Sequence, residues 1–382
     1  MQERAIQPRS VCSFSADDDV TALMTRRGKS LSVPSPLTMA ALSAMLLAAV
    51  LAPCLLRPAH ASTPAGVRKE SLQVSGFGLA SPYTFDAYLP ASSSNATNIA
   101  LVVMLSGFCL PADMQDRMQL RFTDMVASHG FIYVPLKSAH VARTCALCST
   151  TVRAANAMGN MPIYAATAQL LEATSRAGSC TAWDATSACC VPDRAGRDGG
   201  DVPLIRAVIE RVQSVMPVDR RRVSVLGIAN GGFLAMRAAC ELGSQLAGVV
   251  AYAAGLYREQ CSMHNGLPPL LLIQGDVDVV VPFAGASNVA GVPFPGFKES
   301  ARIWSGMEGC TGSAPSQQWV AKGGNDNPLT INVTTYSGCT KPFESWQILN
   351  GQHFALQDTS AVIFQKALTT FLLPKASAAQ FS

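Results

Sequence analysis

Short apolar segments alternate with segments of helical periodicity from residue 99 onwards. Apolar runs rich in β-branched residues predict strands, and apolar residues at intervals of three and four predict helices. The predicted strands are Ile99–Leu105, Phe131–Pro135, Arg222–Leu226, Leu246–Ala253 and Pro269–Gln274, and the predicted helices are Val202–Val215, Phe233–Leu242 and Ser360–Leu373. This alternation favours an α/β fold, with a mainly parallel sheet covered by helices on both faces. We expect functional residues in the turns after Leu105, Leu226 and Gln274, because active sites lie at the carboxyl ends of such strands.

The first sixty residues predict an export signal rather than part of the fold. A short basic segment ending at Lys29 precedes an apolar run from Leu37 to Leu56, and Ala59-His60-Ala61 fits a signal-peptidase site. The run is also long enough to cross a bilayer, so an uncleaved N-terminal membrane anchor is the alternative. We therefore expect an extension and signal peptide over residues 1–61 and one domain over residues 62–382, in a secreted or periplasmic protein.

Composition excludes several classes of protein. The chain has 382 residues, of which 49% are hydrophobic and 14% charged, so it can bury a large core. A net charge of +4 without a block of Lys and Arg gives no surface for nucleic acid. We expect no nucleic-acid partner, and no membrane contact beyond a retained anchor.

Ten of the 12 cysteines follow the signal segment. An even number in an exported chain favours disulfides. Cys145 and Cys148 have the spacing of a zinc-binding or redox pair, but no second Cys/His pair at finger spacing follows them. We therefore expect structural disulfides and no metal.

The turn after Leu226 has the form of a nucleophile elbow. The segment Arg222-Val-Ser-Val-Leu-Gly-Ile-Ala-Asn-Gly-Gly-Phe predicts a strand, a tight glycine-flanked turn and a helix, the setting of G-x-S-x-G. Ala229 occupies the central position, and a methyl group cannot attack a carbonyl carbon. An ordinary glycine-rich turn or a phosphate-binding loop is the alternative. The dinucleotide fingerprint and the P-loop lysine are both absent, so we expect no cofactor.

From about Ile99 to His353 the chain resembles the secreted α/β-hydrolase esterases grouped as polyhydroxybutyrate depolymerase-like or feruloyl esterase-like proteins. The motifs that carry the resemblance, in chain order, are Trp183-Asp-Ala-Thr-Ser-Ala-Cys-Cys190, Gly200-Asp201-Val202, the segment from Pro217 to Glu241, Gln274-Gly-Asp-Val-Asp-Val-Val-Val-Pro282, and Cys310 with Cys339. The resemblance implies a single α/β-hydrolase domain stabilised by disulfides, with Cys240 bonded to Cys261 and Cys310 bonded to Cys339.

The resemblance also assigns roles to individual residues. Asp278 takes the position of the triad acid and His353 that of the triad base, in the chain order that this fold uses. Asn230 and Phe108 take the positions that stabilise an oxyanion. Asp276 is a rival for the acid, and a turn-forming aspartate and a core histidine are the structural alternatives.

The departures from the family pattern extend beyond Ala229. The family usually has His-Gly where this chain has Ser106-Gly107, and a histidine where it has Gln274. Ser224 lies inside a predicted strand and Ser106 on the oxyanion loop, so neither replaces the missing nucleophile. These changes favour a natural loss of the serine.

The sequence leaves three hypotheses of function. The first is a secreted pseudoenzyme whose pocket binds an ester, a hydroxycinnamoyl group or another protein without turnover. The second is slow hydrolysis by a water that His353 activates, because enzymes without a complete triad keep some catalysis. In the third, Ala229 is an artefact of the gene sequence and the protein is an ordinary serine ester hydrolase.

Overall fold

The structure, a computed structural model, describes residues 63–95, 97–141, 180–185, 200–256, 261, 266–289, 292–324, 327–353 and 357–373. The predicted signal segment, the pair Cys145 and Cys148, and the pair Cys189 and Cys190 lie outside these residues. The described residues from Pro64 onwards form one compact unit.

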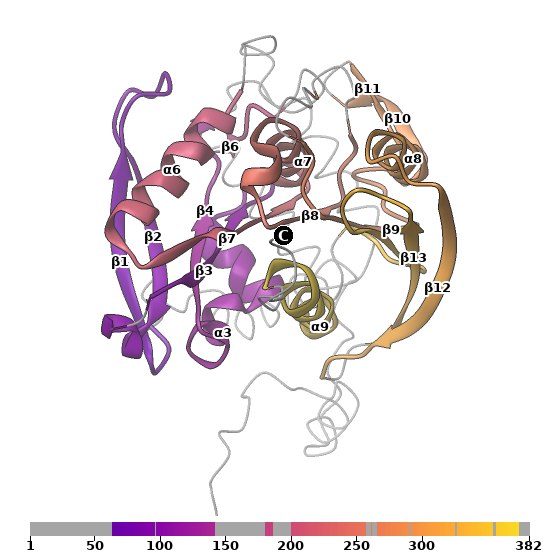
Figure 1. Cartoon of the computed structure of the whole chain (residues 1–382). Helices are drawn as coiled ribbons and strands as arrows, with labels where there is room; N and C mark the ends of the chain where they lie inside the picture. Colours follow the sequence, from indigo (N-terminus) through magenta and orange to yellow (C-terminus); the bar gives the residue numbers. More distant parts are fainter. Residues whose placement is uncertain are drawn as a thin grey trace, which may run out of the picture. The chain divides into compact units, whose positions relative to one another are not determined.

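Ten strands form one sheet with a parallel centre (Figure 1). They are β1 (Val67–Val74), β2 (Tyr83–Pro90), β3 (Ile99–Leu105), β4 (Phe131–Leu136), β7 (Val218–Ile228), β8 (Gly248–Tyr252), β9 (Leu270–Gly275), β12 (Gly312–Ala321), β13 (Leu329–Ser337) and β14 (Phe343–Ile348). Their order is β1-β2-β4-β3-β7-β8-β9-β14-β13-β12. The strands from β4 to β14 in this order pair in parallel, and two antiparallel strands extend each edge.

The mainly parallel α/β sheet confirms the predicted fold class. Strand β3 is buried at every residue, which explains its continuous apolar sequence. The antiparallel edge strands escaped the sequence analysis, because only alternate residues of strands such as β1 and β13 are shielded from solvent.

The described α-helices range in length from 4 residues in α2 to 14 in α6. They are α2 (Ala112–Gln115), α3 (Phe122–His129), α6 (Val202–Val215), α7 (Asn230–Leu242), α8 (Phe297–Met307) and α9 (Gln357–Ala367), with η1 (Ala91–Asn95), η2 (Asp116–Leu120), η4 (Gly243–Gln245) and η6 (Leu368–Leu372) as 3-10 or π segments. Two small antiparallel sheets pair β5 (His140–Val141) with β6 (Thr181–Ala182), and β10 (Gly285–Val289) with β11 (Val292–Pro295). Helix α8 was not predicted.

Each face of the sheet has its own hydrophobic core. Leu101 and Val103 of β3 pack into a core with residues of α6, α7 and α8, whereas Val102 and Met104 pack into a second core with residues of α3 and α9. Figure 1 shows α6 and α7 on one side of the sheet and α3 and α9 on the other. The alternation of side chains along a strand thus binds helices to both faces, as the sequence predicted.

Three disulfides join described residues. Cys240 is bonded to Cys261 and Cys310 to Cys339, the two pairs that the resemblance implied. The third bond joins Cys109, just after β3, to Cys180, just before β6. Within the described part of the chain, no helix has the length and apolarity needed to cross a bilayer.

Candidate active site

The carboxyl ends of the parallel strands bring four turns to one edge of the sheet. Leu105 of β3 lies opposite Gly227 of β7, and Ile348 of β14 lies opposite Gly275 of β9. The turns that follow these strands therefore start side by side, with β8 between β7 and β9. Three of them are the turns that the sequence marked, and the fourth carries His353.

Ala229 occupies a sharp turn between β7 and α7. Its φ of 52° and ψ of −117° lie in a region that residues with a side chain rarely adopt. Glycines allow the close approach around it. A Cβ on Gly227 would lie 2.0 Å from the carbonyl oxygen of Gly231, and one on Gly231 would lie 2.1 Å from that of Leu105. The backbone therefore has the strained form of a nucleophile elbow, with a methyl group at its apex.

His353 and Asp278 form a buried pair. His353 Nδ1 lies 2.8 Å from Asp278 Oδ2, and the two residues are 2% and 4% exposed. The other carboxylate oxygen accepts hydrogen bonds of 2.8 Å from the backbone N–H groups of Val280 and Val281. These bonds fix the carboxylate, so that it can orient the imidazole with the proton on Nδ1 and the lone pair on Nε2.

The rival aspartate has a different partner. Asp276 Oδ2 accepts a hydrogen bond of 3.1 Å from Gln347, and it is Asp278 that lies against His353. The side chain of Gln274 donates a hydrogen bond of 2.6 Å to the carbonyl of Val281. The glutamine thus supports the same turn that presents Asp278.

Tyr252 connects the elbow to the segment that carries the histidine. Its carbonyl accepts a hydrogen bond of 2.9 Å from the N–H of Ala229, and its hydroxyl donates one of 3.4 Å to the carbonyl of Gln352. A Cβ on Gly275 would lie 2.1 Å from the carbonyl oxygen of Gly351. The residues just before His353 are therefore packed against the ends of β8 and β9, on the side of the sheet edge where the elbow lies.

The turn after β3 lies against the apex. A Cβ on Gly107 would lie 3.7 Å from the Cβ of Ala229. The N–H of Gly107 donates to Gln115 Oε1 at 2.7 Å, whereas no described residue accepts a hydrogen bond from the N–H of Phe108. Phe108 thus keeps a backbone donor in this turn, as an oxyanion role requires. The amide side chain of Asn230 instead binds the backbone of Trp183, so a role for Asn230 at an oxyanion falls to its backbone N–H.

Two buried serines, Ser224 and Ser106, were considered as substitutes for the missing nucleophile. Ser224 is fully buried within β7 and donates to the carbonyl of Leu372 at 3.0 Å. Ser106 Oγ is buried without a hydrogen-bond partner among the described residues. In the part of the chain that the structure describes, no three His, Cys, Asp or Glu side chains gather as metal ligands.

Comparisons with known proteins point to esterases. No family model matches the chain. Over 139 residues, 34% of its length, the chain is 31% identical to feruloyl esterase B of Piromyces equi, and over 89 residues it is 35% identical to a protein of Nocardia uniformis subsp. tsuyamanensis named as an esterase. The matches span about a quarter of each relative, 25% and 26% of their lengths. Acetyl xylan esterase from Aspergillus awamori aligns over 77% of this chain and 99% of its own, with 13% identity and a TM-score of 0.47.

The order of the site residues, together with the parallel sheet and the elbow between β7 and α7, decides the fold. The chain has the α/β-hydrolase fold. In this fold the nucleophile, the acid and the histidine follow one another along the chain, and the residues predicted for these positions, Ala229, Asp278 and His353, have the same order. Its similarity to esterases is a local one, confined to about a third of the chain or less.

The sequence did not predict a second buried histidine–carboxylate pair in this α/β-hydrolase fold. His140 Nε2 lies 2.6 Å from Asp201 Oδ1, and Asp201 Oδ2 accepts a hydrogen bond of 2.8 Å from the N–H of Asp184. The sequence marked Asp201 only as part of a lead into α6. Nothing in the sequence pairs it with a histidine 61 residues away. The pairing of His140 in β5 with Ala182 in β6, and the hydrogen bond from Asp184 just after β6 to Asp201, bring the two together.

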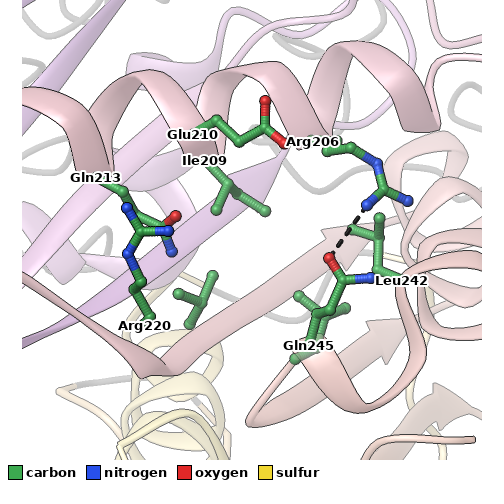
Figure 2. A pocket seen from close by; sticks show the side chains of 9 residues that line it. Arg206, Ile209, Glu210, Gln213, Arg220, Leu242 and Gln245 are labelled. Carbon is green, nitrogen blue, oxygen red and sulfur yellow. Dashed lines mark hydrogen bonds between the residues drawn. The ribbon is translucent and has the colours of Figure 1, made fainter. Parts of the chain in front are cut away.

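A cavity of about 260 Å³ lies away from this site (Figure 2). Arg206 and Glu210 of α6, Arg220 and Val223 of β7, and Gln245 of η4 are among its lining residues, and Arg206 donates to Gln245 at 3.1 Å. Val223 precedes Ala229 by six residues of extended chain, a distance of roughly 20 Å. The cavity is therefore distant from the elbow and takes no part in the candidate site.

Proposed function

We propose that this α/β-hydrolase is a secreted, esterase-like protein that binds an ester or hydroxycinnamoyl ligand and turns it over slowly or not at all. One observation carries the proposal: a buried His353–Asp278 pair shares its edge of the sheet with an elbow whose apex is Ala229. Hydrolysis through an acyl-enzyme needs an oxygen or sulfur nucleophile at that apex, and alanine supplies neither.

The geometry around the apex supports ligand binding. The turn of Gly107 and Phe108 still lies against Ala229, so a backbone donor remains for a carbonyl oxygen. A methyl group in place of a hydroxymethyl leaves more room at the apex for the acyl group. The local similarity to a feruloyl esterase supports a hydroxycinnamoyl ester as the ligand to test first.

The intact acid–base pair favours slow hydrolysis as a second candidate. In this reaction His353 Nε2 accepts a proton from a water molecule, whose oxygen attacks the ester carbonyl carbon. The C–O bond to the alcohol then breaks, and the proton passes from His353 to the departing alkoxide. Enzymes without a complete triad keep about 10³–10⁴-fold acceleration over water from binding and oxyanion stabilisation.

Export is part of the proposal. Three disulfides among the described residues are typical of proteins that fold in an oxidising compartment. Together with the predicted signal segment they support a secreted or periplasmic protein, with a retained N-terminal anchor as the alternative. Localisation of a C-terminally tagged chain, with N-terminal sequencing of the exported form, tests cleavage near Ala61.

Binding and turnover are tested separately on the purified chain. We expect methyl ferulate to bind in calorimetry, and p-nitrophenyl acetate to be hydrolysed at or slightly above the rate without protein. Turnover that disappears in His353→Ala would establish the slow-hydrolase candidate. Absence of binding to methyl ferulate and to other short esters would contradict the proposed ligand class. The mass of the tryptic peptide 223–237 decides whether residue 229 is alanine in the natural protein.

A further inference from the structure

Trp183 is fully buried next to the candidate site, and each of its polar groups makes a hydrogen bond. Its indole N–H donates to the carbonyl of Ser106 at 2.9 Å. Its backbone N–H donates to Asn230 Oδ1 at 2.6 Å, and its carbonyl accepts from Asn230 Nδ2 at 3.2 Å. One residue from a distant part of the chain therefore bonds to both the turn after β3 and the first residue of α7.

The two attachments flank the apex of the elbow. Asn230 directly follows Ala229, and its amide makes two hydrogen bonds to the same peptide segment, which restricts both partners. Ser106 directly precedes Gly107, and a Cβ built on Gly107 would lie 3.7 Å from the Cβ of Ala229. Through its backbone and its indole, Trp183 thus connects Asn230, which follows the apex, to Ser106, which precedes Gly107.

The segment that carries Trp183 is itself held on both sides. Before it, Cys180 is bonded to Cys109, and the carbonyl of Thr181 accepts a hydrogen bond of 2.9 Å from the N–H of Cys109. After it, the N–H of Asp184 donates to Asp201, which lies against His140. The disulfide holds the far end of the turn after β3, and the indole of Trp183 holds its near end at Ser106.

We infer that Trp183 is a positioning residue, which sets the separation between the turn of Gly107 and Phe108 and the apex at Ala229. Through the carbonyl of Ser106, its indole holds the backbone of this turn where it can meet the carbonyl oxygen of a bound ester. The identity of that ligand rests on the proposed function, whereas the positioning itself does not.

The test compares two tryptophan-to-phenylalanine variants by hydrogen exchange. Trp183→Phe removes the indole N–H, while Trp304→Phe makes the same change at another fully buried tryptophan of the same core, whose Nε1 has no described partner. The amides of Gly107 and Cys109 report on the turn, because both are hydrogen-bonded in the native chain. We expect exchange in the peptide over residues 106–110 to be about tenfold faster in Trp183→Phe and unchanged in Trp304→Phe.

A second variant removes the hydrogen bonds between Trp183 and Asn230, the residue that follows the apex of the elbow. Asn230→Ala removes both bonds to the Trp183 backbone, and we expect it to speed exchange over residues 106–110 as well. Slow exchange throughout β3 in the same samples shows that each variant is folded. If neither variant speeds exchange over residues 106–110, or if Trp304→Phe speeds it equally, Trp183 has no positioning role.

Calorimetry with methyl ferulate separates this inference from the proposed function. We expect Trp183→Phe to weaken binding about tenfold and Trp304→Phe to leave it unchanged. If the unmodified chain does not bind the ester, the proposed ligand is wrong and the exchange experiment still decides the role of Trp183. If the chain binds it and Trp183→Phe binds equally well, the positioning of the turn has no part in recognition.

Discussion

His353 lies 2.8 Å from the carboxylate of Asp278, although the residue at the apex of the elbow has no hydroxyl group for the histidine to deprotonate. Burying a carboxylate is costly unless it is hydrogen-bonded, and here two backbone N–H groups and the imidazole supply the bonds. The chain thus holds an oriented imidazole, whereas the predicted nucleophile position carries a methyl group. The site can therefore be tested by adding a hydroxyl group at residue 229.

Ala229→Ser should restore esterase activity. The elbow already holds residue 229 at a φ of 52°, so the added hydroxyl enters a turn that needs no rearrangement. We expect p-nitrophenyl acetate hydrolysis to rise by about 10²–10³-fold, below the full effect of a triad serine because neighbouring residues also depart from the family pattern. The double variant Ala229→Ser/His353→Ala should return to the starting rate. Equal activity of the single and double variants would show that His353 does not act on residue 229.

The acid should be Asp278 and not Asp276. In the Ala229→Ser background, Asp278→Asn is expected to lower kcat by about 10²–10³-fold, which removes the gain made by the serine, because an amide favours the wrong imidazole tautomer. Asp276→Asn is the matched control, since Asp276 bonds to Gln347 instead of the histidine. We expect it to change kcat by less than about threefold. A larger loss in Asp276→Asn than in Asp278→Asn would reverse the assignment.

Loss of the disulfide near the site should destabilise the chain more than loss of a shorter one. The bond between Cys109 and Cys180 closes 71 residues of chain, and that between Cys240 and Cys261 closes 21. By loop entropy, replacing both cysteines by serine should cost about 1 kcal/mol more in the first case. Urea unfolding of the two double variants measures the difference. A greater loss for the shorter loop would contradict the entropic explanation.

Asp116 should make stability fall as the pH rises. Burial raises the pKa of this carboxyl above its ordinary value of 3.8, despite backbone hydrogen bonds from Phe122 and Thr123. The folded chain therefore holds the proton more tightly than the unfolded chain does. The stabilisation is complete below the ordinary pKa and is lost as the pH rises through the raised one.

Asp116→Asn should remove this contribution. Urea unfolding from about pH 4 to about pH 7 should show a smaller fall in the free energy of unfolding for Asp116→Asn than for the parent. Asp113→Asn, an exposed change in the neighbouring helix α2, serves as the control and should keep the parental slope. Parallel curves for all three proteins would mean that Asp116 has an ordinary pKa in the folded chain.

Much of the central fold was predictable because burial on both faces leaves a clear pattern. Ile99–Leu105 and Val202–Val215 were predicted with the bounds that β3 and α6 have, since one is apolar throughout and the other has a strong helical period. Helix α8 was missed, and so were the edge strands, where half of each strand is polar. For such segments the neighbours in space, not the local pattern, decide the structure.

The sequence alone determined that the predicted apex carries a methyl group, because residue 229 is alanine. It also determined the chain order of Ala229, Asp278 and His353, and the glycines that a tight elbow needs. Only the tertiary structure decided that Asp278 and not Asp276 lies against His353, since the two aspartates stand two residues apart in one turn and only their orientation distinguishes them. The bonds from Trp183 to Ser106 and Asn230 likewise join residues 77 and 47 positions apart, and no local pattern encodes such contacts.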